Sequence, residues 1–222
     1  MTVDLQVLAA PFGSIMFDCL EPLSQAMLDA YATYVLPGTY SSVAIFGRYL
    51  ENLTPDEISR ILNHPRHYGL LCIGESRANG YVPSTMQGLQ DGTREANRYN
   101  ALTLPRGGGI VWDAEGMGGT SQNAADSGNA YAGAVQANGN QCIAYVGDSV
   151  PLSPAQLYAL RETLYWHSLS NVQQVATCDY AMVQAYPTRV VDLGAAGVHQ
   201  VDVSLIYSDK RGRAPMIVRA AA

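Results

Sequence analysis

The chain alternates short apolar runs with longer stretches in which apolar residues recur at helical spacing. Runs rich in Val, Ile and Tyr predict buried strands, and the longer stretches predict amphipathic helices. The runs that predict strands span residues 13–19, 41–50, 68–76, 107–113, 141–150, 172–178, 180–186 and 198–207. The stretches that predict helices span residues 23–36, 54 onwards, 87–99, 121–139 and 155–169.

Two of the predicted helices begin with capping signals. Thr54 is followed by Pro55, which suits the first helical position, and by Glu57, which completes a capping box. The sequence Ser-Pro-Ala-Gln at residues 153–156 repeats this arrangement. Both signals support the helix boundaries that the apolar pattern predicts.

The order of these elements predicts the fold class. Repeated strand–helix order is typical of a parallel sheet. About eight strands and about five helices favour an α/β fold, a single (β/α)₈-type TIM barrel over residues 1–222. The C-terminal part of this barrel is degenerate, because the runs between residues 172 and 207 leave no room for full helices. An open doubly wound sheet is the alternative.

Acidic residues fall where the predicted strands end. Asp18, Glu75 and Asp113 end the first, third and fourth strands, Glu115 follows Asp113 by two positions, and Asp202 lies in the last strand. Strand side chains alternate between faces, so Asp113 and Glu115 are expected on one side. In a parallel barrel, the carboxyl ends of the strands form the active-site face.

Clustered carboxylates cannot all ionise freely, so at least one pKa is expected to rise. A protonated acid beside an ionised carboxylate is the equipment that glycosidic bond cleavage requires. Such acids can also cap a helix or bind a divalent ion, and these alternatives stay open. Arg48 and Arg77 follow the second and third strands, where they could pair with the acids, bind substrate or form surface salt bridges.

The charge, the histidine content and the glycine-rich stretches argue against nucleic-acid, metal and phosphate-loop ligands. The formal net charge is −6 and Lys210 is the only lysine, whereas nucleic-acid binding needs clustered basic residues. The four histidines form no HExxH pattern, and the glycine-rich stretches lack the Lys-Ser/Thr of a phosphate loop. We therefore expect no nucleic acid, no metal and no cofactor.

The cysteine spacing and the lengths of the apolar runs indicate the cellular compartment in which the protein is made. The four cysteines form no CxxC pair and are expected to be reduced and buried. The amino terminus lacks the basic region of a signal peptide, and no apolar run reaches membrane-spanning length. These features predict a protein that is cytoplasmic when made and that has no membrane partner.

Three aromatic residues are expected to pack in the apolar core. Trp112 precedes Asp113 and, by alternation, should face the helix layer. Tyr165 and Trp166 are expected at the end of the last predicted helix. None of the three is expected to contact a ligand.

Several segments, in order along nearly the whole chain, resemble the family 25 glycoside hydrolases, which are N-acetylmuramidase lysozymes. They look still closer to the "glycoside hydrolase-like" barrel domain of unknown function found in bacteria and phages. The matching segments are "MFDCLEPLSQAML", "VAIFGRYLENLTPDEI", "GLLCIGES", "VWDAEG", "CIAYVGD", "AMVQAYP" and "HQVDVSLIYSD". One departure is Cys19 after Asp18, where the lysozymes have an Asp-Val-Ser-type strand.

This resemblance implies roles for individual residues. Glu115 would be the general acid, and Asp113 would stabilise the developing positive charge or orient the substrate N-acetyl group. Asp18 and Asp202 would complete an acidic floor. The residues that the resemblance and the strand ends imply for sugar binding are Glu75, Tyr145, Gln184, Tyr186 and Arg48.

Three functions are compatible with this pattern. The first is a peptidoglycan-cleaving glycosidase, a muramidase-like lysin encoded by a phage and acting on bacterial cell-wall glycan. The second is a non-catalytic barrel that binds glycan or takes part in a phage particle with other phage proteins. The third is a divalent-metal hydrolase with Asp18, Asp113, Glu115 and Asp202 as oxygen ligands.

Overall fold

The computed structural model describes residues 4–35, 43–147, 150–161, 164–169 and 175–221, and these contain ten strands in one sheet and five α-helices. The strands are β1 (Leu5–Ala9), β2 (Ile15–Cys19), β3 (Val43–Tyr49), β4 (Gly69–Ile73), β5 (Gly109–Asp113), β6 (Gln141–Val146), β7 (Leu164–His167), β8 (Met182–Asp192), β9 (Val198–Ile206) and β10 (Met216–Ala220). The helices are α1 (Gln25–Tyr31), α2 (Pro55–Leu62), α3 (Thr85–Ala101), α4 (Ser121–Ala137) and α5 (Pro154–Ala159).

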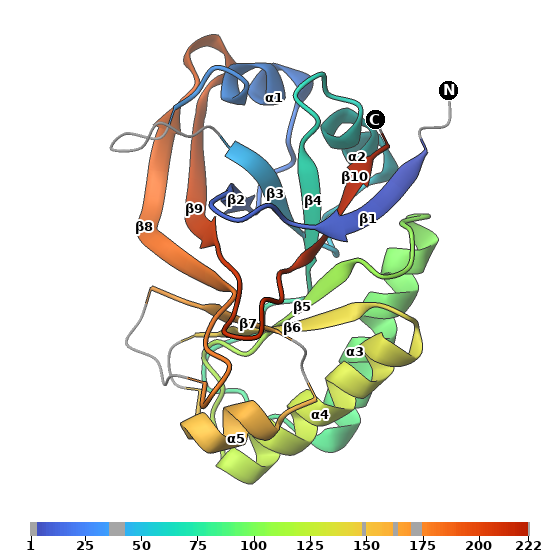
Figure 1. The fold of residues 1–222 in the computed structure, drawn as a ribbon, viewed down its shortest axis with the longest axis vertical. Helices are drawn as coiled ribbons and strands as arrows, with labels where there is room; N and C mark the ends of the chain where they lie inside the picture. Colours follow the sequence, from blue (N-terminus) through green and yellow to red (C-terminus); the bar gives the residue numbers. More distant parts are fainter. Residues whose placement is uncertain (1–3, 36–42, 148–149, 162–163, 170–174, 222) are drawn as a thin grey trace.

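Strands β2 to β9 close into a barrel (Figure 1). The pairing between β4 and β5 completes the circle, so the predicted barrel is confirmed and the open sheet is ruled out. Each strand from β2 to β8 runs parallel to its neighbours within that series, whereas β9 is antiparallel to both β8 and β2. The short link 193–197 between β8 and β9 explains this, because a parallel crossover needs a dozen or more residues.

Two strands outside the barrel were not predicted from the sequence. Strand β1 pairs with β10, and the two lie side by side near both chain ends (Figure 1). Strand β10 also pairs with β4. A Cβ at Gly69 would lie 2.6 Å from Ile217, and one at Gly109 would lie 2.9 Å from the Met216 carbonyl. Strand β10 therefore crosses the barrel where β4 and β5 begin, and covers its amino-terminal end.

The alternation of strand side chains builds two apolar clusters. One lies between the strands and the helices and includes Phe17, Phe46 and Trp112. The other fills the barrel interior and consists of Ala10, Met16, Ile45, Leu71, Ile73, Val111, Ile143, Leu164, Trp166, Ala181, Met182, Ile206 and Ile217. The four cysteines are buried, as expected, and they form no disulfide bond with one another.

Helices α3 and α4 lie side by side against the part of the barrel that holds β5 and β6 (Figure 1). Their backbones approach closely because α3 carries Gly88 and Gly92 on the contact face. A Cβ at Gly88 would lie 2.1 Å from the Ser127 carbonyl, and one at Gly92 would lie 2.5 Å from that of Tyr131. Glycine is needed where two backbones come this near.

The capping signals are confirmed, in different degrees. Ser153 and Gln156 form a complete capping box at the start of α5. At α2, Thr54 accepts a hydrogen bond from the Glu57 amide, but the Glu57 carboxylate points elsewhere, to Arg48 and to the Leu23 amide. The second half of that predicted box is therefore absent.

The predicted fifth helix over residues 155–169 is wrong in its second half. Helix α5 ends at Ala159, and Leu164–His167 form β7. Tyr165 and Trp166 thus belong to a strand, for which aromatic residues are well suited. The predicted strand over residues 172–178 is also wrong where it is described. Residues 176–178 form a turn, with Thr177 in the left-handed conformation, while residues 172–174 lie outside the described part.

No helix in the described part of the chain is both long enough and apolar enough to cross a lipid bilayer.

Candidate active site

Three of the predicted acids lie at the carboxyl-terminal end of the barrel. Asp18 is the penultimate residue of β2, Asp113 ends β5, and Asp202 lies in the middle of the antiparallel β9. Met16 and Val111, two positions before Asp18 and Asp113, belong to the interior cluster. Because strand side chains two positions apart share a face, Asp18 and Asp113 stand directly above the apolar interior.

Asp18 and Asp202 are direct partners across β2 and β9. The Thr188 hydroxyl donates a hydrogen bond of 2.7 Å to Asp202 Oδ1. Asp18 is only 7% exposed, and its Oδ2 has no hydrogen-bond partner among the described residues. Burial raises the pKa of Asp18 well above its ordinary value, and the charges of Asp202 and then Asp113 raise it further.

Asp113 and Glu115 are joined by a turn. The Glu115 amide donates a 3.0 Å hydrogen bond to Asp113 Oδ1, and Gly116 follows with a φ of 69°. Strand β5 has already ended at Asp113, so the two acids are neighbours because the chain turns, rather than through the strand alternation that was expected. Glu115 is half-buried at the rim, and its side chain lies across Gly147.

The pKa of Asp113 is raised to about 6. Burial is the main cause, because an ionised carboxylate loses hydration inside the barrel mouth. Hydrogen bonds from the Glu115 amide and the Ser76 hydroxyl oppose this shift, and the charge of Glu115 adds to it. Asp113 therefore changes protonation state close to neutral pH.

Two partly buried tyrosines, Tyr49 and Tyr145, lie within range of the charges of all four carboxylates. Burial raises the pKa of Tyr49 and of Tyr145 above the ordinary tyrosine value. The negative charges that raise both pKa values further are the same four, from Asp18, Asp113, Glu115 and Asp202. Tyr49 was not predicted as a site residue, although its even spacing from Ile45 and Gly47 places it on the interior face.

Side chains from β6, β7, β8 and β9 are joined by hydrogen bonds and ring packing. The Tyr145 hydroxyl donates to Gln184 Oε1 at 2.8 Å, and the Tyr145 ring packs edge-on against Trp166 with centroids 4.6 Å apart. Trp166 Nε1 in turn donates to the Ser204 hydroxyl at 3.1 Å. The sequence placed Tyr145 and Gln184 here and missed Trp166, which points into the barrel instead of ending a helix. Tyr186 belongs to β8, but its side chain lies outside the described part.

A pocket of about 230 Å³ opens beside the Asp18–Asp202 pair. It is lined by Asp18, Cys19, Leu20, Glu21, Tyr49, Thr188, Gln200, Val201 and Asp202. Its lining therefore combines three carboxylates with a phenol, a hydroxyl and an amide, which are groups that hydrogen-bond polar ligands.

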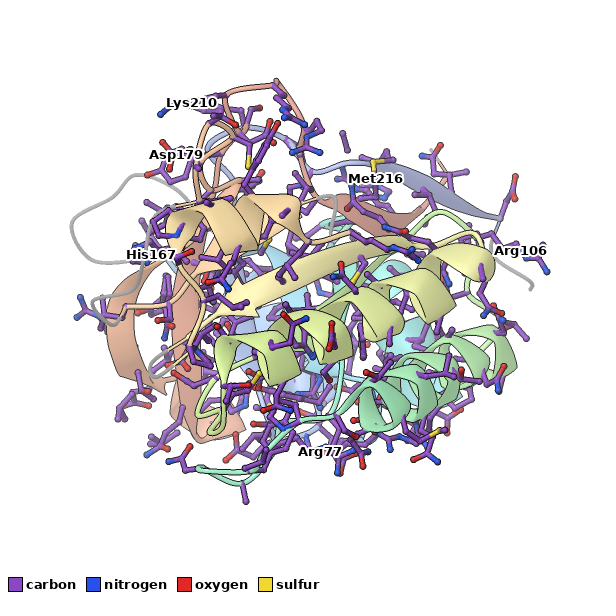
Figure 2. All side chains as sticks on the ribbon, turned by 90° about the horizontal axis from the view of Figure 1, so that it is seen from below. Arg77, Arg106, His167, Asp179, Lys210 and Met216 are labelled. Carbon is purple, nitrogen blue, oxygen red and sulfur yellow. The ribbon has the colours of Figure 1, made fainter. Side chains whose placement is uncertain are left out.

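Glu75 is tied to the helix layer. Its carboxylate lies 2.5 Å from Arg94 and 3.5 Å from Arg77, and Arg77 also pairs with Asp91. Figure 2 shows Arg77 at the edge of the molecule, beyond the end of β4. Glu75 and Arg77 line a second, narrower pocket, which Asp113 also reaches.

Arg48 does not face the acids, so its expected sugar contact is wrong. Its neighbours Gly47 and Tyr49 point inward, so Arg48 points outward, where it is 0% exposed. Its Nε pairs with Glu57 Oε1 at 2.8 Å, and its terminal nitrogens donate to the Cys19 and Leu20 carbonyls. Arg48 is a structural residue that fixes the segment after β2.

Trp112 faces the helix layer, as predicted, and packs near Tyr131.

Among the described residues, no group of three or more His, Cys, Asp or Glu side chains is arranged to hold a metal ion. His199 is hydrogen-bonded to the Tyr31 hydroxyl at 2.6 Å, and His64 lies 3.1 Å from Asp29. Both contacts are on the outer side of the barrel.

No protein-family model and no curated protein sequence matches this chain. Solved structures do resemble it. An uncharacterized protein of B. stearothermophilus has a TM-score of 0.63 at 17% identity, with 90% of this chain and 97% of that one aligned. A family 25 glycosyl hydrolase from Bacillus anthracis has a TM-score of 0.55 at 9% identity, with 90% and 91% aligned.

The modular autolysin LytC of Streptococcus pneumoniae is also similar, with a TM-score of 0.58 at 13% identity. The alignment covers 88% of this chain but 47% of LytC, so this chain corresponds to about half of that protein. LytC has also been solved in complex with a synthetic peptidoglycan ligand. At these identities the likenesses show that the chain has the barrel fold of the family 25 hydrolases.

Proposed function

We propose that this chain is a glycoside hydrolase that cleaves the glycan of bacterial peptidoglycan, as a muramidase-like lysin. The observation that carries the proposal is the placement of two acid pairs at the carboxyl-terminal end of the barrel: Asp18 faces Asp202 across β2 and β9, and the Glu115 amide is hydrogen-bonded to Asp113. A chain that buries carboxylates side by side bears a cost in stability, which a catalytic role would explain. The likeness to hydrolases and to a peptidoglycan-bound autolysin supports the substrate class.

The proton donor in this proposal is Glu115. It is half-buried on a turn at the rim, where a glycosidic oxygen could reach it. As the proton moves to that oxygen and the bond to the anomeric carbon breaks, positive charge develops on the sugar ring. Asp113, which lies deeper and is bonded to the Glu115 amide, stabilises this charge or orients the substrate N-acetyl group.

The other residues hold the sugar. Asp18 and Asp202 form the acidic floor, with Asp202 fixed by the Thr188 hydroxyl. Tyr145 and Gln184 are oriented by their mutual hydrogen bond and present polar atoms to sugar hydroxyls. Their fixed geometry costs little further entropy when a sugar binds.

A turbidity assay on purified peptidoglycan sacculi tests the proposal. The wild type and Asp126→Asn are expected to clear the suspension, and Glu115→Gln is expected not to. Asp126 is the matched control, because it is a carboxylate on the outer helix α4, bonded only to Gln122 in the described residues. If no protein clears sacculi but all co-sediment with them, the chain is a non-catalytic, glycan-binding barrel. A phage origin of the gene belongs to the proposed lysin, whereas a structural role in a phage particle belongs to the alternative, non-catalytic barrel.

A further inference from the structure

A third pocket, of about 140 Å³, lies at the opposite end of the barrel from the carboxylates. It sits where β3 and β4 begin and where β10 crosses them. In Figure 2, Arg106 and Met216, the first residue of β10, mark that side of the molecule, away from Arg77. The pocket is lined by Pro11, Val43, Ala44, Ile45, Arg66, His67, Gly69, Ile217 and Arg219.

The floor of this pocket is apolar. Ile45 and Ile217 are almost fully buried, with 1% and 2% exposure, and Val43 and Ala44 continue the same surface. Gly69 lets Ile217 pack against the start of β4, because a Cβ there would lie 2.6 Å from the Ile217 side chain. A ligand that reaches the floor must therefore carry an apolar group.

The rim is cationic. Arg66, His67 and Arg219 line the pocket and no carboxylate of the described residues does, although the chain has 19 acidic and 13 basic residues. The Arg219 side chain makes no hydrogen bond or ion pair with the described residues, whereas the side chains of Arg48, Arg77, Arg94 and Arg213 all pair with carboxylates. Unopposed like charges gathered around a pocket are favourable when an anion joins them.

The Arg66 guanidinium and the His67 backbone are held in place. Arg66 donates hydrogen bonds from Nε, at 3.0 Å, and from one terminal nitrogen to the Ala32 carbonyl. His67 has a φ of 54° and donates its amide to the His64 carbonyl at 2.8 Å. A fixed guanidinium pays little entropy when it binds, and its geometry matches carboxylate and phosphate oxygens.

We infer that this pocket binds a small organic oxyanion, with its phosphate or carboxylate between Arg66 and Arg219 and its apolar stem against Ile45 and Ile217. The inference does not depend on the proposed glycosidase activity. Such a ligand would join β10 to the segment before β4, so its binding should stabilise the folded protein.

Calorimetric titration of the whole protein at constant ionic strength tests this inference, with n-butyl phosphate, butyrate and inorganic phosphate as probes. A saturable site is expected for n-butyl phosphate or butyrate or both, and the better of these should bind about tenfold or more tightly than inorganic phosphate, because the stem buries apolar surface. Comparison of the phosphate and the carboxylate probes identifies the preferred head group.

Variants separate this site from general charge attraction. Arg219→Gln should weaken binding of the organic probes about tenfold or more, since it removes one charged partner. Arg106→Gln should leave binding unchanged, because Arg106 is an exposed arginine at the same end that does not line the pocket. Ala44→Val, which narrows the floor and suits a strand, should weaken the organic probes and spare inorganic phosphate. Equal binding of all three probes, equal effects of Arg219→Gln and Arg106→Gln, or no saturable binding would overturn the inference.

Discussion

Asp18 and Asp202 face each other across β2 and β9 at the open end of the barrel. Asp18 is buried, and Asp202 reaches it only because β9 returns antiparallel and closes the circle. Two carboxylates in this position cannot both ionise freely, and Asp18 is the one whose pKa is raised well above its ordinary value. Burial and the charge of Asp202 therefore favour the protonated form of Asp18.

The first prediction concerns this pair. Asp202→Asn should lower the pKa of Asp18, because the charge of Asp202 is the largest cause of its elevation after burial. The pKa should stay above the ordinary value, since burial persists. Titration of the carboxyl carbons by NMR measures it, with Asp126→Asn as the control that leaves Asp18 unchanged. An Asp18 pKa that is unchanged in Asp202→Asn would contradict the prediction, because the charge of Asp202 would then have no effect on Asp18.

The second prediction follows from Asp113, which has a folded-state pKa of about 6 against an ordinary value of 3.8. A raised pKa means that the protonated form favours the folded state. This stability is complete below the ordinary value and is lost as the pH rises through about 6. Asp113→Asn, which needs no proton, should therefore stabilise the protein by roughly 3 kcal/mol at pH values above 7, and by little near pH 4.

Denaturant unfolding of Asp113→Asn and wild type at the two pH values measures this difference in the free energy of unfolding. Asp126→Asn, on the surface of α4, provides the baseline and should show no comparable pH dependence. The account of Asp113 fails if the gain in stability is the same in acid and above neutral pH.

The third prediction concerns Arg48 and Glu57, a salt bridge with side chains 0% and 1% exposed. Arg48→Met should destabilise the protein by about 3–5 kcal/mol, because it leaves Glu57 charged and buried without its partner. The double variant Arg48→Met, Glu57→Leu should recover much of this loss. Denaturant unfolding of the three variants checks both statements. A normally stable Arg48→Met with weakened glycan binding would instead return Arg48 to the sugar site.

The fourth prediction concerns Gly147, which allows Glu115 to occupy its place. A Cβ at Gly147 would lie 2.4 Å from the Glu115 Cβ, so Gly147→Ala must displace that turn. We expect a stability loss of about 1–3 kcal/mol and at least a tenfold fall in glycan cleavage. In the matched control Gly133→Ala, on α4, the nearest atom would be 3.4 Å away, and helix propensity should make the change neutral or stabilising. Full activity in Gly147→Ala would show that the position of Glu115 is unimportant.

The sequence predicted those parts of the fold and site that depend on local patterns. Asp18 and Asp113 were placed correctly at strand ends and Asp202 within a strand, because each continues an alternation that runs through its strand. The outward face of Trp112 followed from the same rule. Applied to β3, the same alternation places the Tyr49 side chain inside the barrel and the Arg48 side chain outside it. The sugar contact expected of Arg48 neglected this alternation.

Features that depend on distant pairing could not be predicted in this way. Residues 155–169 keep a helical spacing throughout, yet Leu164–His167 pair with β6 and β8 because the barrel needs a strand there to close. Strands β1 and β10 depend on each other from opposite ends of the chain, as in the pairing of Leu5 with Ala220. The turn that brings Glu115 beside Asp113 depends on a side-chain hydrogen bond, which strand periodicity does not encode.

Analysis of the new chain ends in digested peptidoglycan tests the central claim most directly. Wild type and Glu115→Gln are incubated with purified peptidoglycan, and the soluble products are assayed for reducing sugar ends and for free amino groups. We predict that wild type releases reducing ends without free amino groups, and that Glu115→Gln releases about a hundredfold fewer. Equal release of reducing ends by both proteins, or products with free amino groups alone, would contradict the claim that Glu115 and its neighbouring acids cleave a glycosidic bond.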